Sequence, residues 1–250
     1  MVVRLTKHIL TDKIIKLVDI EDWETAMTSN ENYPELNFKD PYSKITCLLL
    51  YLYSMELGTP PLYAEANRVA RDMDFSEQET LGPFIMGLYF VTMWANKARD
   101  DTDKIKTGAM IGGEVNNIAG SYLLWRGAGM QAQWIKDIEK MIGVSFKFKG
   151  NTSCSRSAKV ALGFAHSNLR EGFKPVLFVV AITNYQGILG MAMNHEAYTA
   201  YPNEGEYLFM DGATVNVWEF DREYTIMNPY ESLSEYNGRT ITIIHLLHAK

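Results

Sequence analysis

Residues 203–209 carry the sequence NEGEYLF, in which two glutamates stand two positions apart at the start of an apolar run. A β-strand has a side-chain period of two residues, so we expect Glu204 and Glu206 to point to the same side. The pair is either an idle, solvated strand edge or a working pair, in which one carboxylate holds a substrate and the other handles a proton. The rest of the chain has to decide between these two interpretations.

The composition predicts a soluble globular protein of one or two domains. Of its 250 residues, 47% are hydrophobic and 22% are charged, which is ordinary for such a protein. The net charge is −6 and the chain has no run of lysines or arginines, so no nucleic-acid partner is expected. The two cysteines are too few for a disulfide framework, which fits a reducing compartment.

No segment has the character of a signal peptide or a membrane span. The N-terminus, MVVRLTKHIL, lacks the apolar core of a signal peptide. The longest apolar runs, Ile45–Met55 and Pro83–Trp94, are shorter than the about 20 residues that a transmembrane helix needs, and we interpret them as buried helices. These features predict an intracellular, cytoplasmic protein without a membrane span.

Two regions of different character are interpreted as two lobes of one domain. Residues 1–115 are expected to be helical, with an amphipathic helix that begins at Pro61 and an apolar helix over Pro83–Arg99. Residues 116–250 are expected to be rich in strands, because apolar runs of strand length alternate with turn signals. The fold class is therefore α+β.

The β-rich lobe is expected to be mainly antiparallel. Pro175–Thr183 is a continuous apolar run rich in β-branched residues and is interpreted as a central strand. Asp211-Gly212 predicts a hairpin between strands over residues 206–210 and 214–218. Ser157–Ala165 is expected to be a short helix with Val160, Ala161 and Phe164 turned inward. Further strands are expected over residues 121–125, 144–148 and 239–247, and a further helix over residues 134–141.

Common cofactor and metal motifs are absent from the sequence. It contains no glycine-rich dinucleotide or phosphate loop, no H-E-x-x-H and no C-x-x-C. The five histidines form no metal-ligand spacing, so no metal is expected.

Polar side chains stand at the ends of three of the expected strands. Arg126 follows the first strand, Ser153-Cys154-Ser155 comes after the strand over residues 144–148, and Glu204-Gly205-Glu206 opens a third. Polar groups at strand ends, carried by a rigid sheet, are where binding sites are built. Taken singly, Arg126 is a typical surface residue, and Ser155 or Ser157 is a typical helix N-cap. The order of the three features is far more specific than any one of them.

That order resembles the Arg–Ser–Glu class of mono-ADP-ribosyltransferases over roughly residues 60–220. The resemblance rests on four motifs: Leu124-Trp125-Arg126-Gly127 for the arginine motif; Phe148, Ser153-Cys154-Ser155, Val160, Ala161 and Phe164 for the Ser-Thr-Ser strand and its helix; Tyr201-Pro202, Glu204-Gly205-Glu206 and Leu208 for the Glu-x-Glu loop; Leu62-Tyr63, Asn67 and Arg71 for an N-terminal helix. The chain departs from the family in having Cys154 in place of threonine and extra residues at Lys149–Thr152. The assignment of Ser153 and Ser155 within the serine motif is therefore open.

The resemblance implies a fold and an activity. The fold would be one ADP-ribosyltransferase domain over roughly residues 60–250, with a helical N-terminal lobe packed on a mainly antiparallel β-sandwich that binds NAD. The activity would be transfer of ADP-ribose from NAD to an exposed arginine of a target protein, with release of nicotinamide. Breaking the nicotinamide–ribose bond develops positive charge on the ribose, as in glycoside cleavage.

The resemblance also implies roles for individual residues. Arg126 suits the anionic diphosphate of NAD, because its fork of donors is planar and always charged. Gly127 would let the backbone approach the nicotinamide amide. Glu206 would stabilise the charged ribose and accept a hydrogen bond from a ribose hydroxyl. Glu204 would orient the acceptor arginine and take its proton, since a protonated guanidinium is a poor nucleophile.

Three further residues complete the expected NAD site. Ser153 would position Glu206 or the ribose by hydrogen bonding, and Ser155 is the alternative for this role. Phe164 is either a wall beside the nicotinamide or a core residue, and we expect the core. Tyr198 or Tyr201, on the loop before Glu204, would contact the acceptor.

Two other interpretations remain open. The first is an NAD glycohydrolase, in which water is the acceptor. The second is a catalytically degenerate fold kept as a structural subunit of a larger assembly, with the N-terminal helical region as its partner surface. The departures at Cys154 and Lys149–Thr152 leave room for the second, whereas retention of the polar residues Arg126, Ser153, Glu204 and Glu206 argues against it.

Overall fold

The computed structural model describes residues 50–54, 63–64, 67–68, 122–167, 169–182, 190–193, 199–209, 212–227 and 231–248. The chain divides into two compact units, each made of several segments. The first unit comprises Met1–Asn116, Lys149–Asn151 and Met191–Pro202, and the second comprises Asn117–Phe148, Thr152–Gly190 and Asn203–Lys250. The helices predicted after Pro61 and over Pro83–Arg99 lie outside the described residues, apart from two short helical pieces at 63–64 and 67–68.

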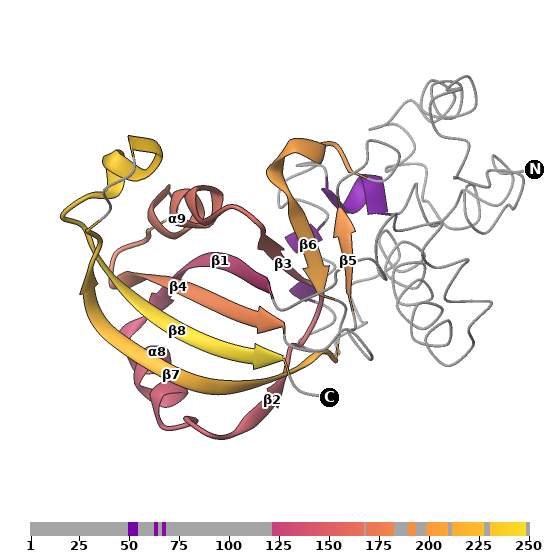
Figure 1. The fold of residues 1–250 in the computed structure, drawn as a ribbon. Helices are drawn as coiled ribbons and strands as arrows, with labels where there is room; N and C mark the ends of the chain where they lie inside the picture. Colours follow the sequence, from indigo (N-terminus) through magenta and orange to yellow (C-terminus); the bar gives the residue numbers. More distant parts are fainter. Residues whose placement is uncertain are drawn as a thin grey trace, which may run out of the picture. The chain divides into compact units, whose positions relative to one another are not determined.

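In the described part of the second unit, seven strands form one mixed sheet in the order β2-β7-β8-β4-β1-β3-β6 (Figure 1). The strands are β1 (Tyr122–Gln131), β2 (Ser145–Lys147), β3 (Thr152–Ser155), β4 (Phe173–Ile182), β6 (Glu206–Phe209), β7 (Thr214–Thr225) and β8 (Thr240–His248). The other elements are helices α8 (Ala132–Glu139) and α9 (Ala158–Ser167), the 3-10 helices η1 (Pro202–Glu204) and η2 (Glu231–Tyr236), and strand β5 (Gly190–Met193).

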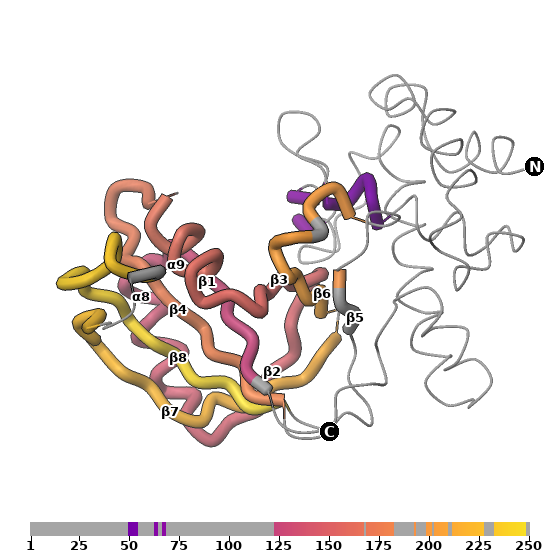
Figure 2. Tube along the Cα trace, turned by 45° about the horizontal axis from the view of Figure 1, so that its top comes forward, coloured from indigo at the N-terminus to yellow at the C-terminus, as the bar shows by residue number. Residues whose placement is uncertain are grey.

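The sheet is antiparallel at every described pairing of these seven strands except the parallel pair β4–β8. Figure 2 shows β7, β8, β4 and β1 running side by side. The predicted central strand is confirmed as β4, which is mainly apolar and has buried residues from Val176 to Ile182. Its neighbours are β1 on one side and β8 on the other.

The family resemblance implied a sandwich, whereas the described strands hydrogen-bond into a single sheet. The reason lies in β1, which pairs with β4 over its whole length and with β3 at one position, Trp125 opposite Ser155. This single pair joins the short ladder of β3 and β6 to the long ladders of the other strands. A mainly antiparallel, strand-rich second half is confirmed, with the division into two sheets replaced by this junction.

Two of the expected strand boundaries are wrong. Arg126 lies in the interior of β1, not at its end, because the strand continues to Gln131. Ser153–Ser155 belong to a strand of their own, β3, and not to a loop after β2. Both motifs therefore lie inside the hydrogen-bonded ladder, where the backbone holds them more firmly than a loop would.

The predicted hairpin around Gly212 is also wrong. The turn itself exists, since Gly212 has a φ of 87°. However, β6 pairs with β3, while β7 pairs with β2 and β8. Backbone hydrogen bonds from Gly212 N to Phe148 O and from Phe148 N to Ala213 O, each of 2.9 Å, tie the turn to the segment before β3. The chain therefore leaves β6 for the far end of the sheet.

Helix α9 packs on β1 and β4 through small residues. Its buried residues are Ala161, Leu162 and Ala165, whereas Phe164 is 50% exposed. The prediction that Val160, Ala161 and Phe164 face inward is therefore right for Ala161 and wrong for Phe164. The helix approaches the sheet so closely that its contact face centres on Ala161 and Ala165, one turn apart, and Phe164 falls to the side.

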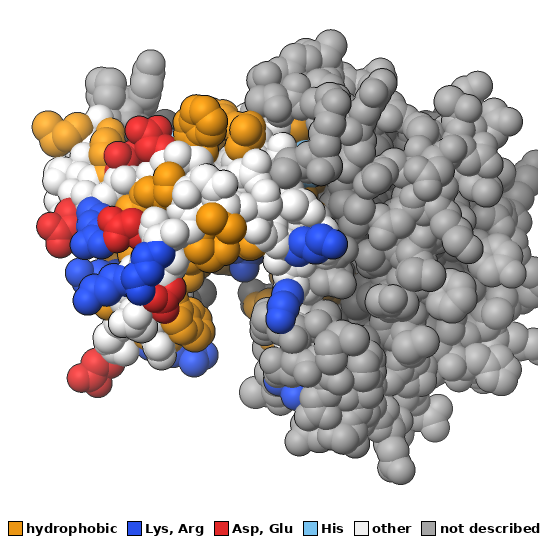
Figure 3. All heavy atoms as spheres, turned by 90° about the horizontal axis from the view of Figure 1, so that it is seen from below, with side chains coloured by type: hydrophobic (Ala, Val, Ile, Leu, Met, Phe, Trp, Pro, Cys, Tyr) orange, Lys and Arg blue, Asp and Glu red, His pale blue; other side chains and the backbone are white. Residues whose placement is uncertain are grey.

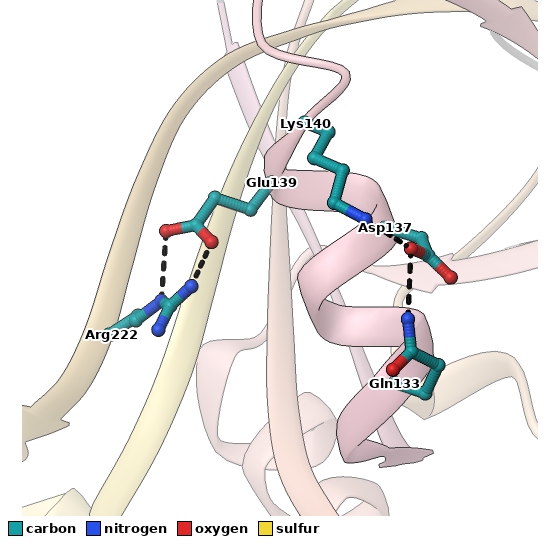
Figure 4. A network of polar contacts seen from close by, with 5 residues as sticks. All are labelled: Gln133, Asp137, Glu139, Lys140 and Arg222. Atoms are coloured by element: carbon teal, nitrogen blue, oxygen red, sulfur yellow. Dashed lines mark hydrogen bonds and ion pairs between the residues drawn. The ribbon is translucent and has the colours of Figure 1, made fainter.

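Helix α8 is linked to β7 by polar contacts at its C-terminal end (Figure 4). Arg222 donates two hydrogen bonds to Glu139, of which the one from Nε to Oε1 spans 2.8 Å. On the helix itself, Asp137 accepts hydrogen bonds from Gln133 at 3.1 Å and from Lys140 at 3.0 Å. These groups are exposed, so solvent screens them and they fix the geometry more than they stabilise the fold.

The surface shown in Figure 3 has acidic and basic side chains interspersed among hydrophobic ones. Among the residues that are coloured in this view, charges of one sign do not form a continuous field of the kind that binds nucleic acid. Within the described parts of the chain, no helix combines the length and apolar character needed to cross a membrane.

Two adjacent leucines in β1 differ strongly in burial. Leu124 is fully buried and Leu123 is 46% exposed. We expect Leu124→Ala to lower the free energy of unfolding by about 2–5 kcal/mol, because it removes buried methyl groups and leaves a cavity. The matched change Leu123→Ala should lower it by less than about 1 kcal/mol. Denaturant unfolding measures both, and equal losses would contradict the described orientation of β1.

Candidate active site

The strand order brings the three polar motifs onto adjacent strands. Arg126 lies on β1, the serine motif on β3 and Glu206 at the first position of β6. Ser155 stands opposite Trp125 on one side and opposite Glu206 on the other. Motifs separated by up to 80 residues in the sequence are thus neighbours in the sheet, with β3 in the middle.

The side chain of Arg126 is hydrogen-bonded to the backbone of β3. Its Nη1 donates a hydrogen bond of 2.6 Å to the backbone carbonyl of Ser153. A charged donor makes such a bond short and strong. One guanidinium has five N–H donors, and this bond uses one of them. The charge of Arg126 also reaches Glu206, whose pKa it lowers.

The surroundings of Glu206 disfavour the ionised form of its carboxyl group. Burial raises its pKa, and the nearby charge of Glu204 raises it further. A hydrogen bond with the Ser153 side chain and the charge of Arg126 act in the opposite direction, but the pKa remains above its ordinary value. The fold therefore holds a carboxyl group poised to ionise at a higher pH than usual, which is typical of functional sites.

Ser155 holds the loop that carries the other carboxylate. Its hydroxyl donates a 2.8 Å hydrogen bond to the carbonyl of Glu204 and accepts a 2.9 Å hydrogen bond from the backbone N–H of Ser157. The next residue adds a second tie, since Arg156 N donates to Gly205 O at 2.8 Å. The two serines that the sequence left undistinguished thus have different partners: Ser153 contacts Glu206, and Ser155 holds the backbone of Glu204.

Gly205 separates the two carboxylates by a change of backbone direction. Its φ is 58°, a left-handed conformation that favours glycine, and a Cβ there would lie 3.4 Å from Cβ of Arg156. Glu204 ends the 3-10 helix η1, and only Glu206 is in the strand. The period-of-two argument for a common side is therefore wrong for Glu204. The two charges nevertheless interact, as the pKa of Glu206 shows.

Cys154 is a buried neutral thiol. It is 2% exposed and stands opposite Tyr207 on β6. Burial raises the pKa of its thiol to about 12, with Arg126 lowering it and Glu206 raising it by smaller amounts. The thiol is therefore protonated at neutral pH and is not a nucleophile. It fills the position where the resembling family has threonine with a small, apolar group.

Gly127 has a packing role that the sequence did not reveal. A Cβ on this residue would lie 1.7 Å from Ala161 O and 2.6 Å from Ala165 N, both backbone atoms of α9. The approach of helix and strand thus requires glycine here, whatever contact it makes with NAD. The signal in the sequence was the spacing of Ala161 and Ala165, one helical turn apart.

The remaining expected residues are found as follows. Phe164 is half exposed, so its interpretation as a core residue is wrong and the alternative, a wall of the site, stays a prediction. Ser157 is confirmed as a cap of α9, since its hydroxyl accepts a 3.4 Å hydrogen bond from Val160 N. Tyr201 is 44% exposed, and Tyr198 and Arg71 lie outside the described residues.

The first unit holds the described part of the N-terminal motif. Asn67 Nδ2 donates a 2.8 Å hydrogen bond to the hydroxyl of Tyr53, which in turn donates to Asn151 O at 3.5 Å. A Cβ on Gly150 would lie 3.0 Å from the side-chain oxygen of Asn67. Within the first unit, Asn151 is thus hydrogen-bonded to Tyr53, and Gly150 packs closely against Asn67. In the described residues, no group of histidine, cysteine and acidic side chains is arranged to hold a metal ion.

Comparison with known proteins identifies the fold. No protein-family model and no curated protein matches the chain. Among solved structures, it is similar to the ADP-ribosyltransferase HopU1 of Pseudomonas syringae, with 13% identity and a TM-score of 0.54 over 91% of this chain and 87% of that one. It is also similar to exoenzyme S of Pseudomonas aeruginosa, with 14% identity and a TM-score of 0.51 over 95% of this chain and 86% of that one. The chain has the fold of mono-ADP-ribosyltransferases, as the order of its motifs predicted.

The site itself generates a prediction about stability. Because the pKa of Glu206 is raised in the folded protein, its protonated form favours folding. This contribution is complete below the unfolded pKa and is lost as the pH rises through the raised folded pKa. We therefore expect Glu206→Gln to raise the melting temperature at pH 7, with the gain shrinking toward pH 4.

The control is Glu171→Gln at an exposed turn, which should leave the melting temperature almost unchanged at both pH values. Thermal unfolding of the three proteins at pH 4 and pH 7 provides the measurement. Destabilisation by Glu206→Gln at pH 7 would show that the partners of Glu206 stabilise its ionised form. That result would contradict a raised pKa of Glu206 in the folded protein.

Proposed function

We propose that the chain transfers ADP-ribose from NAD to the side chain of an arginine in a target protein and releases nicotinamide. The observation that carries the proposal is the setting of Glu206: a partly buried carboxylate with a raised pKa, bonded to Ser153, with Arg126 and Glu204 in electrostatic range. The fold is one that supports this chemistry in other proteins, and exoenzyme S was solved bound to carba-NAD.

The proposed donor side uses Glu206 and Arg126. Cleavage of the nicotinamide–ribose bond leaves positive charge on the ribose, and an adjacent carboxylate fixed by Ser153 stabilises that charge without having to reorganise. Burial strengthens this attraction, because the local dielectric is low. Arg126, whose guanidinium is hydrogen-bonded to the Ser153 carbonyl, is suited to the diphosphate of NAD. Gly127, Ser155 and Phe164 are proposed as further contacts around the dinucleotide.

The proposed acceptor side uses Glu204. An arginine guanidinium is protonated at neutral pH and becomes a nucleophile only as a base removes a proton. Glu204 lies two residues from the ribose carboxylate, and its backbone is held by Ser155. The interaction of its charge with Glu206 supports a position near the bond that breaks. Glu206 therefore acts on the ribose of the donor NAD, and Glu204 acts on the acceptor arginine.

Label transfer from NAD tests these roles. We expect Glu206→Gln to reduce both transfer to arginine and NAD hydrolysis by at least about 100-fold, because the charge that stabilises the ribose is gone. Glu204→Gln should lose mainly transfer, with NAD hydrolysis retained. Near-normal turnover by Glu206→Gln would refute the assignment. Hydrolysis without transfer by the unsubstituted chain would favour a glycohydrolase.

The pH profile gives an independent check. Glu206 has to be ionised to act, and its pKa is raised, so kcat/KM should fall on the acid side at a pH above the ordinary glutamate value of about 4.3. Removing the charge of Glu204 removes one cause of that shift. We therefore expect Glu204→Gln to move the acid limb of NAD hydrolysis to lower pH. A limb that stays in place would mean that the two carboxylates are not coupled.

A further inference from the structure

Two consecutive residues of β1 hold the segment that runs from β3 into α9. Arg126 binds the carbonyl of Ser153 on β3, and Gly127 lies against the backbone of α9 at Ala161 and Ala165. The serine motif and the start of α9 lie between these two points of contact. Arg126 and Gly127 thus contact both ends of the segment that carries Ser153 and Ser155.

The start of α9 is connected in turn to the loop of Glu204. The N–H of Ser157, just before the helix, donates to the hydroxyl of Ser155, and the same hydroxyl donates to the carbonyl of Glu204. Ser157 also caps the helix by accepting from Val160 N. A shift of α9 along or away from the sheet is therefore transmitted through one buried hydroxyl to the backbone of Glu204.

We propose that Gly127 is a positioning residue for the acceptor carboxylate. It sets how close α9 lies to β1, and through Ser157 and Ser155 it sets the place of Glu204 relative to Glu206. The inference rests on the proposed function for the roles of the two carboxylates, and it is distinct from the expectation that Gly127 approaches NAD. The relay is made of backbone and hydroxyl contacts that all lie within the second unit.

The size of the effect follows from the contact distance. The helix backbone lies 1.7 Å from the position of a Cβ at residue 127, where contacts below 3.0 Å are essentially never found, so α9 has to move by more than about 1 Å to admit one. The atoms in the way are Ala161 O and Ala165 N, so trimming a side chain does not relieve the clash. A displacement of about 1 Å at a catalytic group can lower a rate by about 100-fold.

The test compares two glycine-to-alanine changes, one at the packing of β1 against α9 and one on α9 away from it. Gly127→Ala crowds the helix backbone, whereas at Gly163 on α9 a Cβ would meet only the Tyr236 hydroxyl, at 3.5 Å. We expect Gly127→Ala to lower the ratio of arginine transfer to NAD hydrolysis at least tenfold, measured with the folded variant. Gly163→Ala should leave this ratio unchanged. A ratio within twofold of the unsubstituted chain for Gly127→Ala would overturn the proposal.

A second variant separates the relay from general destabilisation. Ser155→Ala removes the hydroxyl without crowding the helix, and it too should lower the ratio of transfer to hydrolysis. In the Ser155→Ala background, Gly127→Ala should have less effect on the ratio than it has alone, because the connection is already broken. If Gly127→Ala does not fold, Ser155→Ala alone decides: an unchanged ratio overturns the proposal.

A measurement that does not depend on catalysis can test the positioning role of Gly127 separately from the proposed function. The titration of Glu206 can be followed by carbon NMR of its carboxyl group, in the field of Arg126 and Glu204. Movement of Glu204 away from Glu206 should bring the pKa of Glu206 closer to its ordinary value in Gly127→Ala but not in Gly163→Ala. An unshifted titration in Gly127→Ala would overturn the positioning role, whereas absence of any reaction with NAD would overturn only the proposed function.

Discussion

The four-residue strand β3 is the constraint on which the site depends, because within the described sheet it joins β1 to β6. It pairs with β1 at one residue and with β6 at four. Its alternation divides the motif: Ser153 and Ser155 take one side of the strand and Cys154 the other. The side with the two serines is hydrogen-bonded to Glu206 and to the backbone of Glu204, and the side with Cys154 is buried. Moving β3 by one residue would exchange the two sides and separate both carboxylates from their partners.

The electrostatics of the site oppose the stability of the fold. Glu206 is partly buried and lies near a second carboxylate, and neither Ser153 nor Arg126 fully offsets the resulting rise of its pKa. A protein selected for stability alone would have no reason to retain such a group. Destabilised, preorganised charges are typical of sites that act on a charge developing in a substrate. On the other side of β3, burial raises the pKa of the Cys154 thiol, so this neighbouring group adds no negative charge.

The fold class and the order of the motifs could be predicted from the sequence, because strand-length apolar runs and turn residues are local signals. Pairing could not be predicted in the same way. The turn at Gly212 is real, yet the strands that flank it are not partners, since partner choice depends on contacts with distant segments such as Phe148. The different partners of Ser153 and Ser155 also required the register of β3 against β6. The exposure of Phe164 followed from the close approach of α9 to Gly127, and the only local signal of that approach was the spacing of Ala161 and Ala165.

The most direct test of the central claim is to incubate the chain with NAD and a small guanidino compound and to determine the products by mass. The expected products are free nicotinamide and a guanidino compound heavier by one ADP-ribose. Release of nicotinamide with free ADP-ribose as the sole other product would contradict the acceptor role of Glu204. Unchanged NAD, together with no detectable binding at millimolar concentration, would contradict the assignment of Arg126 and Glu206 to an NAD site.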